Sequence, residues 1–218
     1  MSKVTTVHNS PEIVRWNMDK RYLRDLVTER ISIIPTTFVE SVEDLDQARL
    51  GLDVMVKPTV SAGSNDTARF VDDPESARVF AKEILDTDRA VMVQPYESAI
   101  DEMGETGLLY FSGQFSHAFC KGAIFRNGDA THNGLYVEEE ISPRQPSSHE
   151  LELGDRVIQM VAGRFDALPV YARVDMVSSP DGSASIMEVE LIEPSLFLHV
   201  DERAATNAAR ALAALLRP

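Results

Sequence analysis

Two kinds of hydrophobic spacing alternate along the chain, and their alternation predicts a mixed α and β protein. Apolar residues three to four positions apart indicate helices, whereas short runs rich in β-branched and aromatic residues indicate strands. The expected helices begin near Asn17 or Asp19 and then cover residues 41–51, 73–86, 148–161 and 201–216. The expected strands cover residues 36–39, 53–57, 90–94, 106–111, 114–121, 170–177 and 185–192.

Turn and cap signals fix several boundaries. Asp73 followed by Pro74 predicts a helix start, because the aspartate accepts free N–H groups and a proline at the first helical position has no N–H to lose. Ser112-Gly113 predicts a tight hairpin. The turn at 179–182 predicts that the strands on either side of it pair in antiparallel fashion. Residues 122–148 are expected to form a long loop.

Composition narrows the class of protein. The 218 residues carry 21 Lys and Arg against 35 Asp and Glu, a net charge of −14, which argues against a nucleic-acid partner. A single cysteine, Cys120, rules out a disulfide within the chain and favours a reducing compartment. The apolar stretch at 191–200 is too short and too interrupted to span a bilayer, and residues 1–10 lack the features of a signal peptide. We therefore expect a cytoplasmic protein without a membrane partner.

One candidate phosphate site lies where a predicted strand ends. Lys57 closes the strand, and a loop of small residues with Ser61, Gly63 and Ser64 follows it. Small residues let backbone N–H groups approach a phosphate, and the ammonium group supplies the countercharge. The alternative is a solvated strand end.

A candidate metal site lies on the hairpin near the end of the chain. Period-2 geometry places Glu188 and Glu190 on one face of their strand, and the turn can bring Asp175 opposite them. Carboxylate oxygens of this kind suit Mg²⁺. The alternative is a solvated acidic face.

Four cations accompany these groups. Arg173 lies two residues before Asp175, hence on the same strand face, where it either binds an anion or forms a structural ion pair with Glu188 or Glu190. The other three are expected to be solvated surface charges: Lys121, Arg126 and Arg144. The five histidines show no metal-ligand spacing, and Cys120 is interpreted as a small core residue.

The order of these motifs resembles the ATP-grasp superfamily. After Lys57 and its loop come VMVQPY at 91–96, RVD at 173–175 and MEVELIEP at 187–194. The pattern is most similar to the branch that includes bacterial glutathione synthetases and cycloserine-forming ligases, and it extends from Trp16 to the C-terminal helix.

The resemblance implies an α+β fold in which two α+β subdomains clasp a nucleotide. It implies a residual N-terminal segment at 1–18, a small lid subdomain at 19–95, and a large subdomain at 96–218 that carries the metal-binding hairpin. The residues implied to contact the ATP phosphates are Lys57, Lys20, Ser61, Gly63 and Ser64. The implied adenine-binding strand holds Gln94, Pro95 and Tyr96, and either Glu97 or Glu105 is implied to contact the base or the ribose. The implied ligands of Mg²⁺ or Mn²⁺ are Asp175, Glu188 and Glu190.

The implied activity is that of an ATP-dependent ligase, with a small-molecule acid and an amine as substrates. The acid would be activated as an acyl phosphate, with Lys57 and Arg173 in catalytic roles, and captured by the amine. One alternative is a nucleotide-binding module without ligase activity, acting as a subunit or a degenerate paralogue. A further alternative is an acidic interaction protein with no nucleotide site.

Two departures from the family pattern bear on the expected site. The family often has Glu-x-Asn where this chain has Glu188-Val189-Glu190, so Glu193 is a further candidate ligand. The segment before Lys20 is also short for the family. We therefore expect part of the substrate wall to be missing, or to be supplied by a separate N-terminal-type domain or by a homodimer partner.

Overall fold

The computed structural model describes residues 5–63, 65–123, 130–131 and 140–216. The chain divides into two compact units. Unit 1 comprises residues 1–33, 102–122 and 140–218, and unit 2 comprises residues 34–101 and 123–139. Among the described residues, none of the helices combines the length and the apolar character that crossing a bilayer requires.

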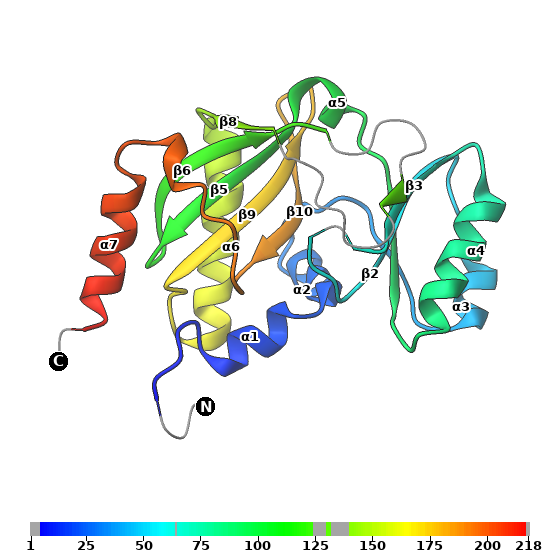
Figure 1. Cartoon of the computed structure of the whole chain (residues 1–218), viewed down its shortest axis with the longest axis horizontal. Helices are drawn as coiled ribbons and strands as arrows, with labels where there is room; N and C mark the ends of the chain where they lie inside the picture. The colour runs from blue at the N-terminus through cyan, green and yellow to red at the C-terminus, as the bar shows by residue number, and fades with distance from the viewer. Residues whose placement is uncertain (1–4, 64, 124–129, 132–139, 217–218) are drawn as a thin grey trace. The chain divides into compact units, whose positions relative to one another are not determined.

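Unit 1 is built on a five-stranded sheet in which every neighbouring pair is antiparallel (Figure 1). The strand order is β10-β9-β5-β6-β8. The strands are β5 (Glu105–Phe111), β6 (Gln114–Lys121), β8 (Ile141–Pro143), β9 (Tyr171–Ser178) and β10 (Ala184–Glu190).

The hairpin of β5 and β6 turns in two residues, as Ser112-Gly113 predicts. Phe111 pairs with Gln114, and both residues between them have positive φ, 48° for Ser112 and 76° for Gly113. This combination is a type I′ turn, whose twist matches that of the flanking strands.

Two long helices pack on the sheet of unit 1. Helix α6 (Ser148–Phe165) lies across one face and buries Val157 and Val161, while α7 (Ala204–Ala214) packs beside β5 and β6 (Figure 1). At Gly154 the helix comes so close to the sheet that an added Cβ would lie 2.4 Å from the Tyr110 hydroxyl oxygen. Glycine is therefore required where α6 crosses β5.

The N-terminal part of unit 1 holds a helix that the hydrophobic pattern did not predict. Helix α1 (Pro11–Asn17) begins at Ser10, whose hydroxyl accepts from the backbone N–H of Ile13. The Ser10-Pro11 pair carries the same start signal as Asp73-Pro74, so the sequence held the information. The chain continues through the 3-10 helix η1 (Lys20–Tyr22) into α2 (Leu23–Thr28), where a helix was expected.

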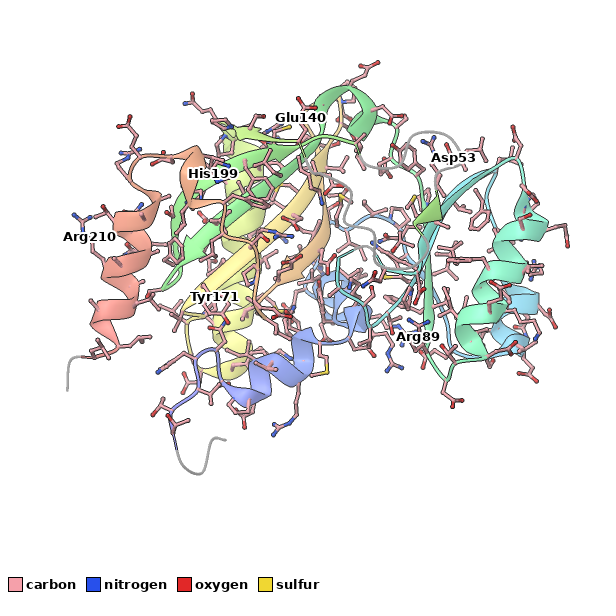
Figure 2. The ribbon with its side chains drawn as sticks, in the orientation of Figure 1. Asp53, Arg89, Glu140, Tyr171, His199 and Arg210 are labelled. Atoms are coloured by element: carbon pink, nitrogen blue, oxygen red, sulfur yellow. The ribbon has the colours of Figure 1, made fainter. Side chains whose placement is uncertain are left out.

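Unit 2 contains a second antiparallel sheet, in the order β1-β4-β2-β3-β7. Asp53 and Arg89 lie at opposite ends of it (Figure 2). Asp73 caps helix α4 as predicted, through a hydrogen bond from the backbone N–H of Ser76. The elements are β1 (Thr37–Val39), α3 (Val42–Gln47), β2 (Asp53–Pro58), β3 (Thr67–Val71), α4 (Pro74–Leu85), β4 (Val91–Pro95) and β7 (Ala130–Thr131).

Several short elements were not predicted. They are strand β3, strands β7 and β8 inside the expected loop at 122–148, helix α5 (Ala99–Met103), and the 3-10 helix η2 (Leu198–Val200). Helix α3 also ends at Gln47, before the expected Gly51. Backbone pairing with a neighbour creates β7 and β8, and runs of two or three residues carry no periodicity by which sequence could reveal them.

The two glycines of α6 give a matched test of this packing. We expect Gly154→Ala to lower the free energy of unfolding by roughly 1–3 kcal/mol, because the new methyl group overlaps Tyr110 and Leu108. We expect Gly163→Ala in the same helix to raise it by up to about 1 kcal/mol, because nothing lies within 4 Å of the added Cβ. Urea denaturation of both variants measures the difference, and equal effects would contradict this account of the helix.

Candidate functional site

The register of β9 and β10 brings the predicted charged residues of unit 1 together. Asp175 lies opposite Glu188, and Arg173 lies opposite Glu190. The sequence predicted from the turn at 179–182 that Asp175 lies opposite these glutamates, without deciding which of the two is its partner. A register shift between Ile186 and Glu188 lies next to the site.

Arg173 holds two of the carboxylates. Its Nε lies 2.9 Å from Asp175 Oδ1, its Nη2 lies 2.8 Å from Asp175 Oδ2, and Nη2 also donates to Glu190 Oε1. Nη1 donates to the Ser195 carbonyl at 3.3 Å. The structural ion pair considered from sequence therefore exists. Burial acts to lower the pKa of Arg173, but Asp175 and Glu190 outweigh it and raise that pKa above its ordinary value.

The third carboxylate has a different partner. Glu188 Oε1 lies 3.1 Å from the Nζ of Lys20, whose side chain is only 7% exposed. Burial raises the pKa of Glu190 to about 8, with Asp175 and Glu188 adding to the shift while Arg173 and Lys121 oppose it. The effect of burial and carboxylate repulsion on the pKa of Glu190 thus exceeds that of the nearby cations, so additional positive charge would stabilise the ionised form.

Aromatic groups surround the Arg173 guanidinium. Its Cζ lies 5.8 Å from the Phe119 ring centroid and 6.0 Å from that of Phe197, and the two rings are 4.5 Å apart. Phe119 lies over Gly107 on the neighbouring strand, where an added Cβ would come within 2.2 Å of the ring. No local pattern in the sequence marked Phe119 or Phe197, because strand pairing and the segment after β10 bring them to Arg173.

A buried histidine fixes the segment that carries Phe197. The Nε2 of His117 lies 2.8 Å from the Leu196 carbonyl, and its Nδ1 lies 3.0 Å from the Ser116 hydroxyl. Since a carbonyl only accepts, Nε2 carries a proton, and burial lowers the pKa of this imidazole. His117 therefore serves the structure around Arg173.

Two expectations about surface cations are wrong. Lys121 Nζ lies 2.8 Å from Glu105 Oε2, and these side chains are only 15% and 13% exposed. Arg144 Nη2 lies 3.1 Å from Glu150 Oε1, and its Nη1 donates to the Met103 carbonyl. Both side chains are half-buried, Lys121 through direct pairing with Glu105 across two strands and Arg144 against Glu150 at the start of α6. Arg126 lies outside the described residues.

Glu150 joins α6 to the sheet. Its carboxylate accepts hydrogen bonds from the hydroxyls of Thr106 at 2.7 Å and Ser178 at 2.8 Å, and from the backbone N–H of Ser147 at 2.7 Å. Burial acts to raise the pKa of Glu150, but these hydrogen bonds and Arg144 lower it on balance. The ionised carboxylate is therefore part of the folded state.

In unit 2, Lys57 lies on β2, half-buried and opposite Met92 of β4. Ser61 and Gly63 follow in a turn region, with Gly63 at φ 62°, while Ser64 lies outside the described residues. The structure thus places Lys57 at the strand end that the sequence predicted.

The predicted adenine strand is β4. Gln94 is buried and donates from Nε2 to the Thr36 hydroxyl at 2.9 Å, and the exposed Pro95 pairs with Val54. The Cζ of Arg69 lies 3.3 Å above the Tyr96 ring, so an arginine that sequence reasoning missed covers this aromatic group.

The end of this strand is also fixed by ion pairing and hydrogen bonding. Arg69 forms a two-point ion pair with Asp53, and the Tyr96 hydroxyl donates to Asp101 at 2.6 Å. Burial, followed by Asp101, raises the pKa of Tyr96. The hydroxyl is therefore protonated and able to donate at neutral pH.

The charged face of unit 1 has the chemistry of a cation site with an anion-binding group beside it. Carboxylate oxygens are ligands that Mg²⁺ prefers, and Asp175, Glu188 and Glu190 supply them from adjacent strands. In the described part of the chain, however, no three side chains of metal-ligating type stand grouped as a metal would require. Arg173 and Lys20 engage the three carboxylates instead.

Comparison with known proteins finds similar chains over essentially the whole length of this one. The chain is 33% identical to the cycloserine biosynthesis protein DcsG of Streptomyces lavendulae over 229 residues, covering 100% of this chain and 76% of the relative. The crystal structure of D-cycloserine synthetase DcsG superposes with a TM-score of 0.88 at 33% identity, covering 99% of this chain and 76% of that one. No protein-family model matches.

More distant structures share the fold. D-alanine–D-alanine ligase from Bacillus anthracis, solved in complex with ATP, matches with a TM-score of 0.64 at 18% identity, covering 94% of this chain and 66% of that one. The ATP-grasp ligase PsnB, solved with Mg and ADP, also matches with a TM-score of 0.64 at 19% identity, covering 99% and 64%.

The buried Glu150 predicts a pH-dependent contribution to stability. We expect Glu150→Gln to lower the free energy of unfolding at pH 7 by about 3 kcal/mol, because it leaves Arg144 without its partner. Since the folded pKa of Glu150 lies below the unfolded one, its contribution is complete above roughly pH 4.3 and is lost as pH falls through the folded pKa. Urea denaturation of both proteins from pH 7 to pH 3 should show the gap closing.

Exposed Glu152 on the same helix supplies the control. Glu152→Gln should stay within about 0.5 kcal/mol of the unmodified protein throughout this range. A Glu150→Gln gap that does not change with pH would show that the carboxylate is not held in its ionised form.

Proposed function

The chain belongs to the ATP-grasp family of ATP-dependent ligases, and we propose that it activates a substrate carboxylate as an acyl phosphate for capture by an amine. The observation that carries the site assignment is the register of β9 and β10, which sets Asp175 against Glu188 and Arg173 against Glu190 on one face of the sheet. Ligation of this kind needs no side-chain nucleophile. The requirement is to hold phosphate groups and neutralise their charge.

We assign the divalent cation, Mg²⁺ or Mn²⁺, to Asp175, Glu188 and Glu190. Bound there, the cation would withdraw charge from the phosphates of ATP. The raised pKa of Glu190 supports the assignment, because this cluster gains stability from added positive charge. Glu193 is less suited to the cluster, because it follows the end of β10 and has positive φ, 46°.

Arg173 is the group that we assign to the acyl phosphate. A guanidinium stays charged at every physiological pH, and its N–H groups form charge-assisted hydrogen bonds to phosphate oxygens. Asp175, Glu190 and the Ser195 carbonyl fix its direction, while Phe119 and Phe197 limit the access of water. The Arg173 guanidinium is thus already oriented before the reaction takes place.

Lys57 and Lys20 are the proposed contacts to the phosphates of ATP, together with the small residues Ser61, Gly63 and Ser64. The position of Lys57 at the end of β2 supports its role, since a cation at a strand end followed by a small-residue turn can meet phosphate oxygens. Lys20 has Glu188 as its partner and so stands next to a proposed cation ligand.

The adenine base is assigned to Gln94, Pro95 and Tyr96. Of the two carboxylates considered for base or ribose, Glu105 is paired with Lys121, so we favour Glu97, which directly follows Tyr96. The division into a lid at 19–95 and a large subdomain at 96–218 stays a prediction.

Substitution of Lys57 and Asp175 tests these roles. We expect Lys57→Ala and Asp175→Asn each to lower ADP release by roughly 100-fold or more, because each removes charge that acts on the phosphates. The assay uses Mg²⁺-ATP with a panel of D- and L-amino acids offered as acid and amine, and ADP should appear only when both substrates are present.

Lys82→Ala and Glu202→Gln are the matched controls, because both side chains are exposed and have no assigned role. Full turnover in Lys57→Ala or Asp175→Asn would overturn the assigned roles. Stabilisation of the unmodified protein by ATP and Mg²⁺, without turnover on any acid, would instead support a nucleotide-binding module.

A further inference from the structure

Strand β10, which carries Glu188 and Glu190, is the outermost strand of its sheet. It pairs with β9 on one side only, so the backbone groups on its other side need partners from elsewhere. The first of these partners is backbone: the N–H of Ile186 donates to the Ser32 carbonyl at 2.9 Å, and Ile33 forms a bridge with Ile186. The rest of the edge lies beside the two glutamates.

Side chains take the place of a neighbouring strand along that remaining edge. The backbone N–H of Val189 donates to the Tyr22 hydroxyl at 2.7 Å, and the same hydroxyl donates to the Val189 carbonyl at 3.0 Å. Asn17 donates from Nδ2 to the Val189 carbonyl at 2.6 Å and accepts at Oδ1 from the N–H of Leu191 at 2.7 Å. Asn9 reaches the Leu191 carbonyl at 3.0 Å, and also that of Tyr171, labelled in Figure 2.

These contacts are buried and well defined. Tyr22 is 3% exposed and Asn17 is 8% exposed. Burial, followed by the charge of Glu188, raises the pKa of Tyr22 well above its ordinary value, so the hydroxyl keeps the proton that it donates. Trp16 packs against the Tyr22 ring with centroids 5.0 Å apart, which limits rotation of the side chain.

Val189 is the residue between the two glutamates, and both of its backbone polar groups are held by this segment. The segment also carries Lys20, which lies between Asn17 and Tyr22 in sequence and pairs with Glu188. One short stretch of chain therefore fixes the backbone of the proposed ligand strand and supplies a charge partner for one ligand.

We propose that Asn17 and Tyr22 are positioning residues for the metal site: they hold the edge of β10 so that Glu188 and Glu190 face the cation. This inference rests on the proposed function, because it assumes that those glutamates bind Mg²⁺. Neither residue is assigned to substrate, nucleotide or metal. Groups that orient a metal ligand in this way typically alter metal affinity by about 10–100-fold when they are removed.

Tyr22→Phe is the sharpest test, because it removes the hydroxyl and keeps the ring that packs on Trp16. Asn17→Leu is the second variant. Amide hydrogen exchange of the metal-free protein should be at least tenfold faster in residues 184–192 of either variant. The affinity for Mn²⁺, measured by electron paramagnetic resonance in the absence of turnover, should fall by roughly tenfold.

Phe111→Leu is the matched control, because Phe111 lies in the core of unit 1 on β5, packed against Ala208 and Ala211 of α7. It should lower stability while leaving both the exchange of 184–192 and the affinity for Mn²⁺ unchanged. Should Asn17→Leu fail to fold, Tyr22→Phe alone decides the question.

The outcomes separate the two proposals. Unchanged exchange and unchanged Mn²⁺ affinity in a folded Tyr22→Phe protein would overturn the positioning role. Faster exchange with unchanged Mn²⁺ affinity would also overturn it, because the edge would then not govern the site. Absence of Mn²⁺ binding by the unmodified protein would overturn the assignment of the metal ligands itself, and with it the role inferred for Asn17 and Tyr22.

Discussion

A charged side chain loses its hydration when it is buried, and this energetic cost determines how the charged residues on the sheet of unit 1 are arranged. Arg173, Asp175 and Glu190 are compatible with burial because the strand register sets them against one another. Gly107 leaves the space that the Phe119 ring occupies beside them. The remainder of the unit follows: apolar residues on the opposite face meet α6, and the charged face is left for chemistry.

The same rule applied to backbone groups explains the N-terminal segment. An edge strand with unsatisfied N–H and carbonyl groups invites pairing with another chain. Here Asn17 and Tyr22 satisfy that edge with side chains, which requires no further strand and leaves the two glutamates of β10 accessible from the charged face. Under the proposed function, the fold and the geometry of the metal site share this one set of hydrogen bonds.

The incorrect predictions for Lys121 and Arg144 and the missed strand β8 share a cause, since each depends on a partner elsewhere in the fold. Lys121 and Arg144 read as surface charges because their partners, Glu105 and Glu150, are remote in sequence or belong to another kind of element. The three-residue strand β8 forms through its antiparallel pairing with β6. Helix α1 is different, since its Ser10-Pro11 start was visible in the sequence and only the sparse apolar pattern concealed it.

Local chemistry was enough to predict much of this protein: cap and turn residues fixed the start of α4 and the β5–β6 hairpin, and motif order indicated the family. The placement of Asp175 opposite the glutamates of β10 followed from one turn, because a hairpin is a local structure. Only the tertiary structure decided which cations form ion pairs, where Phe197 lies and what covers the edge of β10. Those outcomes depend on groups that are far apart in sequence and lose their hydration together, so no short stretch of sequence predicts them.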